Sequence, residues 1–311
     1  MKIRLNAIFV VIAAAVLSLP FFASAAQSGI QISPVTFDFE IKPTESKEFT
    51  ISLTNLNSSD LNYVIETENF NQVSNDGAPS FAGTGSTDAS VTTLKDWISA
   101  KNSADNSGVI SSKQKKDIVF NVAVPAGAEA GGHYAAVFAK EVKKNTEGQT
   151  ELGVTSRVGS LVLVSVPGDV KKTVNLKGFS IPSFIWKGPV SISALAENTG
   201  SVHYDSQVKV AIKPLIGATS EVDLGKHTII PKNERSYEGT WDKKFPFGYY
   251  KMTASASDGD GAFSSTQQKA VFAIPLLIVV PLIVVIIVIL LIVKYVKKNF
   301  KVVKATSHRE E

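Results

Sequence analysis

The stretch that decides the fold is IVFNVAVPAG, residues 118–127. Every second residue in its first part is large and apolar: Ile118, Phe120, Val122 and Val124. Successive side chains of a β-strand point to opposite faces, so this alternation predicts a strand with one face in a core. The turn residues Pro125-Ala126-Gly127 follow directly and end the strand, and Gly131-Gly132 then opens the next segment.

The same signal recurs along most of the chain. Residues 37–41, 49–53 and 61–65 alternate in the same way, and residues 161–166 form an apolar run, broken only by Ser165, before Pro167-Gly168. A second set of alternating segments begins after residue 171: residues 190–194, 208–212 and 250–256. No amphipathic helix of four turns is found among them. We therefore predict an all-β fold of two tandem Ig-like β-sandwich domains, residues 26–170 and 171–256.

Two polar segments interrupt this pattern. Residues 71–93 are mostly Ser, Thr, Gly, Asp, Asn and Ala, which predicts either a functional loop or a disordered one. Residues 257–269 read SDGDGAFSSTQQK and are predicted to be a flexible stalk. Their Asp-Gly-Asp-Gly start resembles a calcium loop, but Lys269 stands where an EF-hand needs a carboxylate.

The first 25 residues have the pattern of a secretory signal peptide. Two basic residues precede an apolar run at residues 7–19, which is too short to span a bilayer. Ala23 and Ala25 place small side chains where signal peptidase reads them. We expect cleavage after Ala25; the alternative is a retained N-terminal membrane helix.

The C-terminal part has the pattern of a transmembrane helix. Residues 270–293 contain no charge, and a helix of this length reaches about 36 Å, enough for a hydrocarbon core of about 30 Å. A buried core helix is the alternative. The lysines that follow at once predict a cytoplasmic C-terminus: Lys294, Lys297, Lys298 and Lys301. We therefore predict a single-pass cell-membrane protein with residues 26–269 outside, a helix at 270–293 and a basic tail at 294–311.

The charge is divided between the parts of the chain. The whole chain has a net charge of +4, but residues 26–273 carry −2 and residues 294–311 carry +4. The external part therefore has no basic field for nucleic acid. The chain has no cysteine, which excludes disulfides, a thiol nucleophile and a lipoprotein anchor.

No pattern of catalytic residues is present. The chain has no G-x-S-x-G, no Walker A loop, no dinucleotide-binding glycine motif and no H-E-x-x-H. The external histidines His133, His203 and His227 have no local ligand spacing, so no metal site is predicted. We expect a protein without enzymatic activity or cofactor. Trp186 and Trp241 suit either a core or an exposed ligand anchor, and they are the candidate binding-surface residues.

Taken in order, the short motifs of the chain resemble a known family. They are Ser33-Pro34-Val35, Lys42-Pro43, Asn55, Leu94-Lys95-Asp96-Trp97-Ile98, Val124-Pro125, Gly131-Gly132-His133-Tyr134, Arg157-Val158-Gly159-Ser160-Leu161, Glu197-Asn198-Thr199-Gly200-Ser201-Val202-His203 and Pro246-Phe247-Gly248-Tyr249-Tyr250. With the expected signal peptide and C-terminal helix, this set resembles the WxL-interacting surface proteins of Gram-positive and related bacteria. That resemblance implies a peptidoglycan-binding-type first domain and a second domain of host- or WxL-binding type. The polar segment 71–93 and Ala135-Ala136, where a glycine is expected, depart from the pattern, and no ligand-contact residue is carried over.

These patterns together predict a membrane-anchored binding or adaptor protein of the bacterial surface. Its expected partners are cell-wall peptidoglycan or other surface or host proteins, with no nucleic acid and no small-molecule cofactor. A chaperone-like accessory subunit of a secretion or surface-assembly system is the first alternative. A membrane-bound hydrolase and a sensor that signals through the tail are the others.

Overall fold

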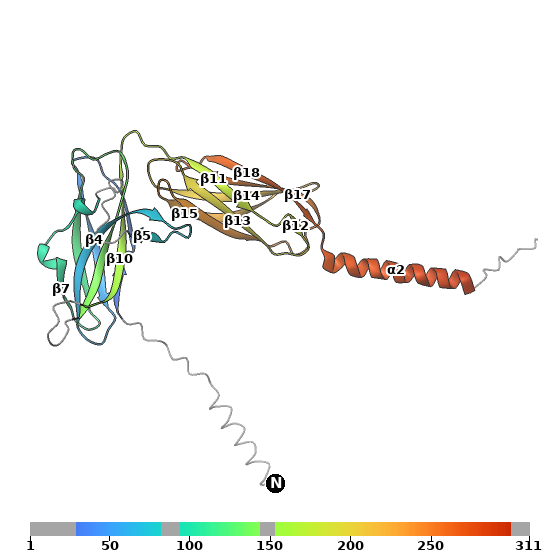
Figure 1. Cartoon of the computed structure of the whole chain (residues 1–311), viewed down its shortest axis with the longest axis horizontal. Coiled ribbons are helices and arrows are strands. Elements are labelled where there is room, and N and C mark those ends of the chain that lie inside the picture. The colour runs from blue at the N-terminus through green and yellow to red at the C-terminus, as the bar shows by residue number, and fades with distance from the viewer. Residues whose placement is uncertain (1–28, 82–93, 144–152, 300–311) are drawn as a thin grey trace, which may run out of the picture.

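The computed structural model describes residues 29–81, 94–143 and 153–299. These residues form two β-sandwiches of the Ig-like type in tandem, followed by one long helix (Figure 1). The predicted fold class is therefore confirmed. The expected signal peptide, with Ala23 and Ala25, lies outside the described residues, as does Lys301.

The described part of the first domain contains ten strands and two short 3-10 helices. They are β1 (Ile30–Ser33), β2 (Thr36–Glu40), β3 (Ser46–Asn55), β4 (Leu61–Val73), β5 (Pro79–Phe81), η1 (Leu94–Trp97), β6 (Ile98–Ala100), η2 (Ser103–Asn106), β7 (Ser107–Ile110), β8 (Lys115–Ala123), β9 (Gly131–Lys143) and β10 (Gly153–Val166). One sheet has the order β1-β3-β8-β6 and the other β2-β10-β9-β4-β5, with β7 beside β4. The side chains of Ile118, Phe120, Val122 and Val124 are all buried between these sheets, as the alternation predicted.

The second domain has the same layered plan with fewer strands. They are β11 (Val174–Ser180), β12 (Phe184–Ile185), β13 (Val190–Asn198), β14 (Tyr204–Pro214), β15 (Ser220–Ile229), β16 (Glu234–Trp241), β17 (Gly248–Ser257) and β18 (Phe263–Ala273). The sheets have the orders β11-β13-β16 and β12-β18-β17-β14-β15. In both domains the first segment of the chain contributes a strand to each sheet. The first strand, β1 or β11, pairs antiparallel with its neighbour in one sheet. The second strand, β2 or β12, pairs parallel with its neighbour in the other sheet.

A buried asparagine closes one end of the first sandwich. Asn55 ends β3 and its side chain is fully buried. Its Oδ1 accepts a hydrogen bond from the backbone N–H of Asn57 at 2.9 Å. Its Nδ2 donates to the carbonyls of Ser59 and Ile110, at 2.8 and 2.9 Å. The amide therefore joins the turn after β3 to the end of β7.

Asn198 has the same place in the second sandwich. It ends β13, is fully buried, and its Oδ1 accepts from the N–H of Gly200 at 2.8 Å. Its Nδ2 donates to the carbonyls of Val202 and Ile229, at 2.9 and 2.8 Å. Each asparagine accepts from residue i+2 and donates to residue i+4 and to the last residue of a distant strand, so the two domains share this arrangement as well as a topology.

The predicted stalk is wrong. Residues 263–273 form β18, which pairs antiparallel with nearly all of β17. The sequence of this segment is mostly polar because its exposed face carries Ser, Thr and Gln. Its buried residues are Val271 and Ala273, near its end. The second domain therefore extends to residue 273 and does not end at 256.

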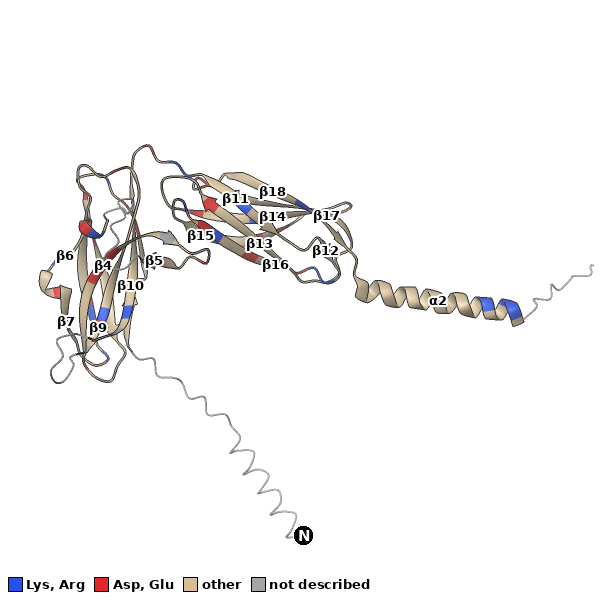
Figure 2. Cartoon of the chain, in the orientation of Figure 1, with Lys and Arg blue, Asp and Glu red and all other residues tan. Residues whose placement is uncertain are grey.

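The C-terminal helix begins later than predicted. Helix α2 (Leu276–Asn299) starts directly after Pro275, a residue that suits the first turn of a helix because it needs no N–H partner there. Residues 270–273, which were assigned to the transmembrane helix, belong to β18. Lys294, Lys297 and Lys298 lie in the last turns of α2 (Figure 2).

Part of the predicted loop 71–93 is also ordered structure. Residues 71–73 complete β4, residues 79–81 form β5, and a tight turn with the hydrogen bond Gly77 N to Ser74 O joins them. In Figure 1 this hairpin extends from the first domain towards the second. Residues 82–93 lie outside the described residues.

Candidate binding site at the domain junction

The two tryptophans proposed as binding-surface residues have different environments. Trp186 is exposed in the turn after β12, whereas Trp241 is only 7% exposed and packs edge-on against Tyr250 with ring centroids 5.0 Å apart. Trp241 is therefore a core residue, and its assignment to a binding surface is wrong. The alternation at the end of β16 points its ring into the sandwich.

The β4–β5 hairpin fastens the first domain to the second. The backbone N–H of Val73 donates to Oδ1 of Asn233 at 2.7 Å, and Nδ2 of Asn233 donates to the carbonyl of Asn71 at 3.0 Å. The N–H of Ser236 on β16 donates to the carbonyl of Asn75 at 2.7 Å. The hairpin thus covers part of the free edge of β16, which would otherwise present unpaired backbone groups.

A second set of polar contacts lies on His203, at the start of β14. Its Nε2 lies 2.9 Å from Oδ1 of Asp38 on β2, and its Nδ1 lies 3.2 Å from the hydroxyl of Tyr134 on β9. The backbone N–H of His203 donates to the same hydroxyl at 3.1 Å. Burial raises the pKa of Tyr134 well above its usual value, so its hydroxyl keeps its proton.

Apolar side chains fill the space between these two polar anchors. Phe70, Tyr134 and Leu163 of the first domain and Ile230 of the second form a small buried cluster. The N–H of Gly132 also donates to the carbonyl of Ser201 at 3.0 Å. The two domains therefore contact each other through a buried apolar cluster and through hydrogen bonds, and not only through the chain that connects them.

A recess of about 420 Å³ opens beside this cluster. Its wall from the first domain is mainly apolar and includes Phe70, Val73, Pro79, Leu161 and Leu163. Its wall from the second domain is polar and comprises Asp205, Lys226, His227, Thr228 and Arg235, next to Ile230. An apolar wall facing a charged one can hold an amphipathic ligand segment in one orientation.

Arg235 is the most unusual residue of the recess. Its Nε is buried and has no hydrogen-bond partner among the described residues. Its guanidinium lies directly against Gly77, where a β-carbon would come within 1.1 Å of Nη1. Gly77 also has a φ of +92°, a conformation that favours glycine. A buried donor without a partner is unfavourable. The guanidinium is also a positive charge on the wall of the recess, so it suits a carbonyl or carboxylate oxygen of a ligand.

The remaining polar residues of the recess are held in place by their neighbours. Thr228 donates to Asp205 at 2.6 Å and Lys226 lies 3.2 Å from the other oxygen, and these contacts lower the pKa of Asp205. Burial, and then the charge of Arg235, lower the pKa of His227. His227 also packs on Tyr237, with ring centroids 5.1 Å apart.

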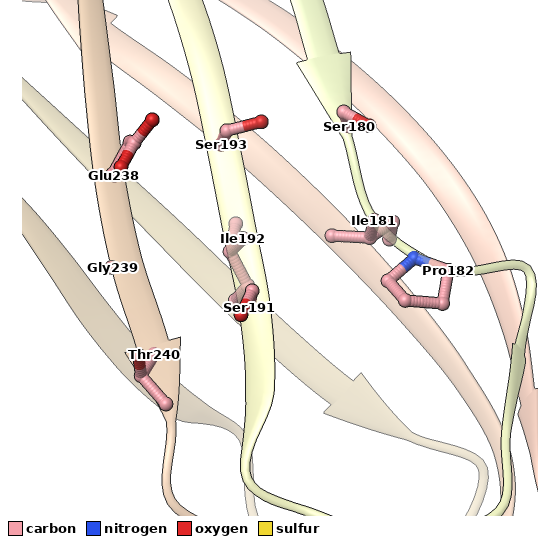
Figure 3. Close-up of a pocket in the computed structure, with 9 residues that line it drawn as sticks. All are labelled: Ser180, Ile181, Pro182, Ser191, Ile192, Ser193, Glu238, Gly239 and Thr240. Atoms are coloured by element: carbon pink, nitrogen blue, oxygen red, sulfur yellow. The ribbon is translucent and has the colours of Figure 1, made fainter.

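A second, shallower recess of about 740 Å³ lies over the three-stranded sheet of the second domain. Figure 3 shows Glu238, Ser193 and Ser180 in one row across β16, β13 and β11, with Thr240 and Ser191 in the next row. This surface offers hydroxyls and one carboxylate for hydrogen bonding. Among the residues that the structure describes, no three metal-ligating side chains converge at either place.

Most of the junction was not found from the sequence. His203 and Tyr134 occur in the short motifs quoted above, but nothing in the sequence pairs them with each other or with Asp38. Arg235, Asn233 and the β4–β5 hairpin were missed altogether. Their only sequence signal is the turn Ser74-Asn75-Asp76-Gly77, which was included in a longer polar segment.

Comparisons with known proteins show only remote similarity. No family model and no curated protein matches the chain. Among solved structures, the class 5 fimbriae chaperone CfaA is 12% identical, with a TM-score of 0.38 over 78% of this chain and 99% of that one. The CsuC–CsuE chaperone–tip adhesion subunit complex from Acinetobacter baumannii is 11% identical, with a TM-score of 0.35 over 79% of this chain and 100% of that one. The E. coli chaperone DraB is 11% identical, with a TM-score of 0.32 over 79% and 98%. Likenesses this remote do not bear on what the present chain does.

Proposed function

We propose that this chain is a membrane-anchored binding protein of the cell surface, whose two Ig-like domains act as one unit on the outer side of the membrane. The observation that carries the proposal is the direct connection between β18 and α2. Only Ile274 and Pro275 separate the last residue of β18 from the first residue of α2. A strand that pairs with β17 along the second domain's sheet therefore continues almost without a break into the anchor.

Helix α2 has the properties that a membrane anchor needs. It is 24 residues long, which corresponds to about 36 Å of helix. None of its residues is buried against the rest of the described chain. Its first 18 residues, Leu276–Val293, are apolar throughout, and lysines follow only in its last turns. An apolar helix with no protein partner needs lipid around it, and the lysines suit the cytoplasmic side.

We propose that the partner binds at the domain junction. Hydrogen bonds at Asn233 and His203 hold the two domains together, so the walls of the 420 Å³ recess keep a fixed spacing. Its apolar wall and the charged guanidinium of Arg235 suit a polypeptide segment that brings one oxygen acceptor and apolar side chains. We propose another surface protein as the partner, acting without enzymatic chemistry and without a cofactor. The family resemblance raises cell-wall peptidoglycan as the alternative ligand.

The test is a retention experiment with the full chain in detergent. The immobilised protein is exposed to insoluble peptidoglycan and, separately, to a detergent extract of native surface proteins. Saturable retention of specific surface proteins, reduced by Arg235→Gln and unchanged by Lys177→Gln on β11, supports the proposal. If only peptidoglycan is retained, the function is cell-wall binding and the proposed protein partner is wrong. Recovery of a secretion or assembly complex favours the accessory-subunit alternative, and binding to none of these overturns the proposal.

A further inference from the structure

The end of the second domain from which α2 leaves carries most of the exposed apolar surface. Eleven large apolar side chains outside α2 are exposed in the described ranges of the chain, and eight of them lie at this end. Scattered exposed apolar residues are normal, but a contiguous group of this kind marks an interaction surface. We call it the helix-proximal patch.

One part of the patch is a row of side chains across the five-stranded sheet. Phe184 on β12 pairs with Phe272 on β18, and Phe272 pairs with Tyr249 on β17. The N–H of Leu215, just after β14, donates to the carbonyl of Tyr249 at 3.0 Å and continues the row. All four side chains are exposed, and Phe272 precedes the first residue of α2 by only four positions.

The other part of the patch lies on the loops at the same end. Trp186 and Phe247 are exposed in the loops before β13 and before β17, and the hydrogen bond from Gly188 N to Lys244 O joins these loops. Ile216, in the loop after β14, is 89% exposed. Phe245 lies beside Lys244 and is exposed as well.

Lysines border these apolar side chains. Lys213 on β14 and Lys251 on β17 lie directly opposite each other, two residues beyond the apolar row on the side away from α2. In a strand two residues cover about 7 Å. Like charges in this position repel each other, and neither lysine has an ion-pair partner among the described residues. Lys187, Lys243 and Lys244 are exposed in the loops.

We propose that the helix-proximal patch rests on the membrane that α2 crosses, with its aromatic and aliphatic side chains at the acyl boundary and its lysines at anionic lipid headgroups. This inference rests on the proposed function, because it requires α2 to span the bilayer. The two residues between β18 and α2 reach about 7 Å at most, so the patch is held close to the headgroups. Aromatic rings gather at membrane interfaces, and lysines reach from apolar surfaces to anionic headgroups.

The absence of cysteine from the chain allows a direct test by single nitroxide labels. The full chain is reconstituted into vesicles of phosphatidylcholine with phosphatidylglycerol, and the label is placed by Phe247→Cys in the patch. Val109→Cys on β7 is the matched control, since it is exposed but lies in the first domain. Val285→Cys reports on the middle of α2. Accessibility of each label to oxygen, which prefers lipid, and to a water-soluble nickel chelate is measured.

The expected result is lipid contact at positions 247 and 285 and water contact at position 109. If the label at 285 contacts lipid and the label at 247 contacts water, the patch does not rest on the membrane, although α2 still spans it. Water contact at 285 overturns the anchor and the docking together. Shielding of 247 from both reagents shows a protein cover on the patch and also overturns the inference.

A second pair of measurements tests the lysines. With the label at 247, Lys213→Glu combined with Lys251→Glu should shift accessibility from oxygen towards the nickel chelate. Replacement of phosphatidylglycerol by phosphatidylcholine should produce a shift in the same direction. Thermal melting of the variant, followed by tryptophan fluorescence, shows whether the second domain remains folded. If the variant is folded and the accessibility of its label at position 247 is unchanged, the role given to the two lysines is overturned.

Discussion

Asn55 and Asn198 show how a single buried side chain can organise one end of a sandwich. Each is fully buried, and each uses its amide to satisfy backbone groups in a turn and at the end of a distant strand. Such groups have no access to water, so the amide replaces solvent as their partner. The sequence signal, an asparagine before a turn, also fits an ordinary turn residue, and its structural role becomes visible only in the fold.

The first prediction concerns Asn198→Ala. The substitution leaves the carbonyls of Val202 and Ile229 without this donor, and we expect the second domain to lose on the order of 3 kcal/mol of stability. Asn175→Ala, on the exposed face of β11, is the control and should change stability by less than about 0.5 kcal/mol. Denaturation of the full chain in detergent, followed by tryptophan fluorescence, measures both. Equal stability of the two variants would contradict the role of Asn198.

The second prediction concerns His227 and pH. Its pKa is lowered in the folded protein from the ordinary value of 6.5, so between that value and the folded pKa the unfolded chain binds more protons. Stability should therefore be highest above pH 6.5 and fall as the pH drops towards the folded pKa. In His227→Gln the fall should be shallower. Melting temperatures of the second domain between pH 7.5 and 5 measure this, and an identical slope in both proteins would exclude His227 as a cause.

Strand β18 could not be recognised in the sequence because its composition is mostly polar. Its exposed face is polar, but it pairs along most of β17, and Val271 and Ala273 are buried in the core. Its side chains also act on β11: Ser265 accepts from the N–H of Leu176 at 2.9 Å, and Gln267 donates to the carbonyl of the same residue at 2.5 Å. These contacts cap the free edge of β11, which protects it from pairing with another chain.

The third prediction follows from this position in the sheet. A chain that ends after residue 257 lacks β18, exposes the edge of β17 and opens the core beside Met252 and Ala254. We expect its second domain to fail to fold. A chain that ends after residue 273 retains every strand and should fold. Limited proteolysis compares them, and equal resistance of the two second domains would show that β18 is dispensable.

The whole molecule depends on contacts between its two domains. The hairpin of β4 and β5, the anchors at Asn233 and His203 and the apolar cluster around Phe70 together fix one sandwich against the other. The recess that we assign to a partner exists only because of this arrangement, since each domain supplies one wall. Loss of the junction should therefore affect binding before it affects either fold.

The fourth prediction tests this rigidity. Asn233→Ala combined with Gly77→Ala removes the amide that holds Val73 and forces a β-carbon against Arg235. We expect a broader distribution of distances between spin labels at Val109→Cys and Thr219→Cys, measured by pulsed electron resonance on the full chain. Asn175→Ala provides the unaffected reference. A distribution as narrow as the reference would mean that other contacts suffice to hold the domains.

The sequence by itself determined the alternating strands of the two cores, the two sandwiches and the existence of an apolar helix. These features depend on local patterns: alternation such as that of Ile118, Phe120 and Val122, turns at Pro and Gly, and the uncharged run that includes residues 276–293. Only the tertiary structure decided the rest. β18 is a strand because β17 supplies its hydrogen bonds, Trp241 is a core residue because β16 faces it inward, and Arg235 meets Gly77 from a distant part of the chain. Contacts of this kind join residues far apart in sequence, and no local pattern encodes which residues will meet.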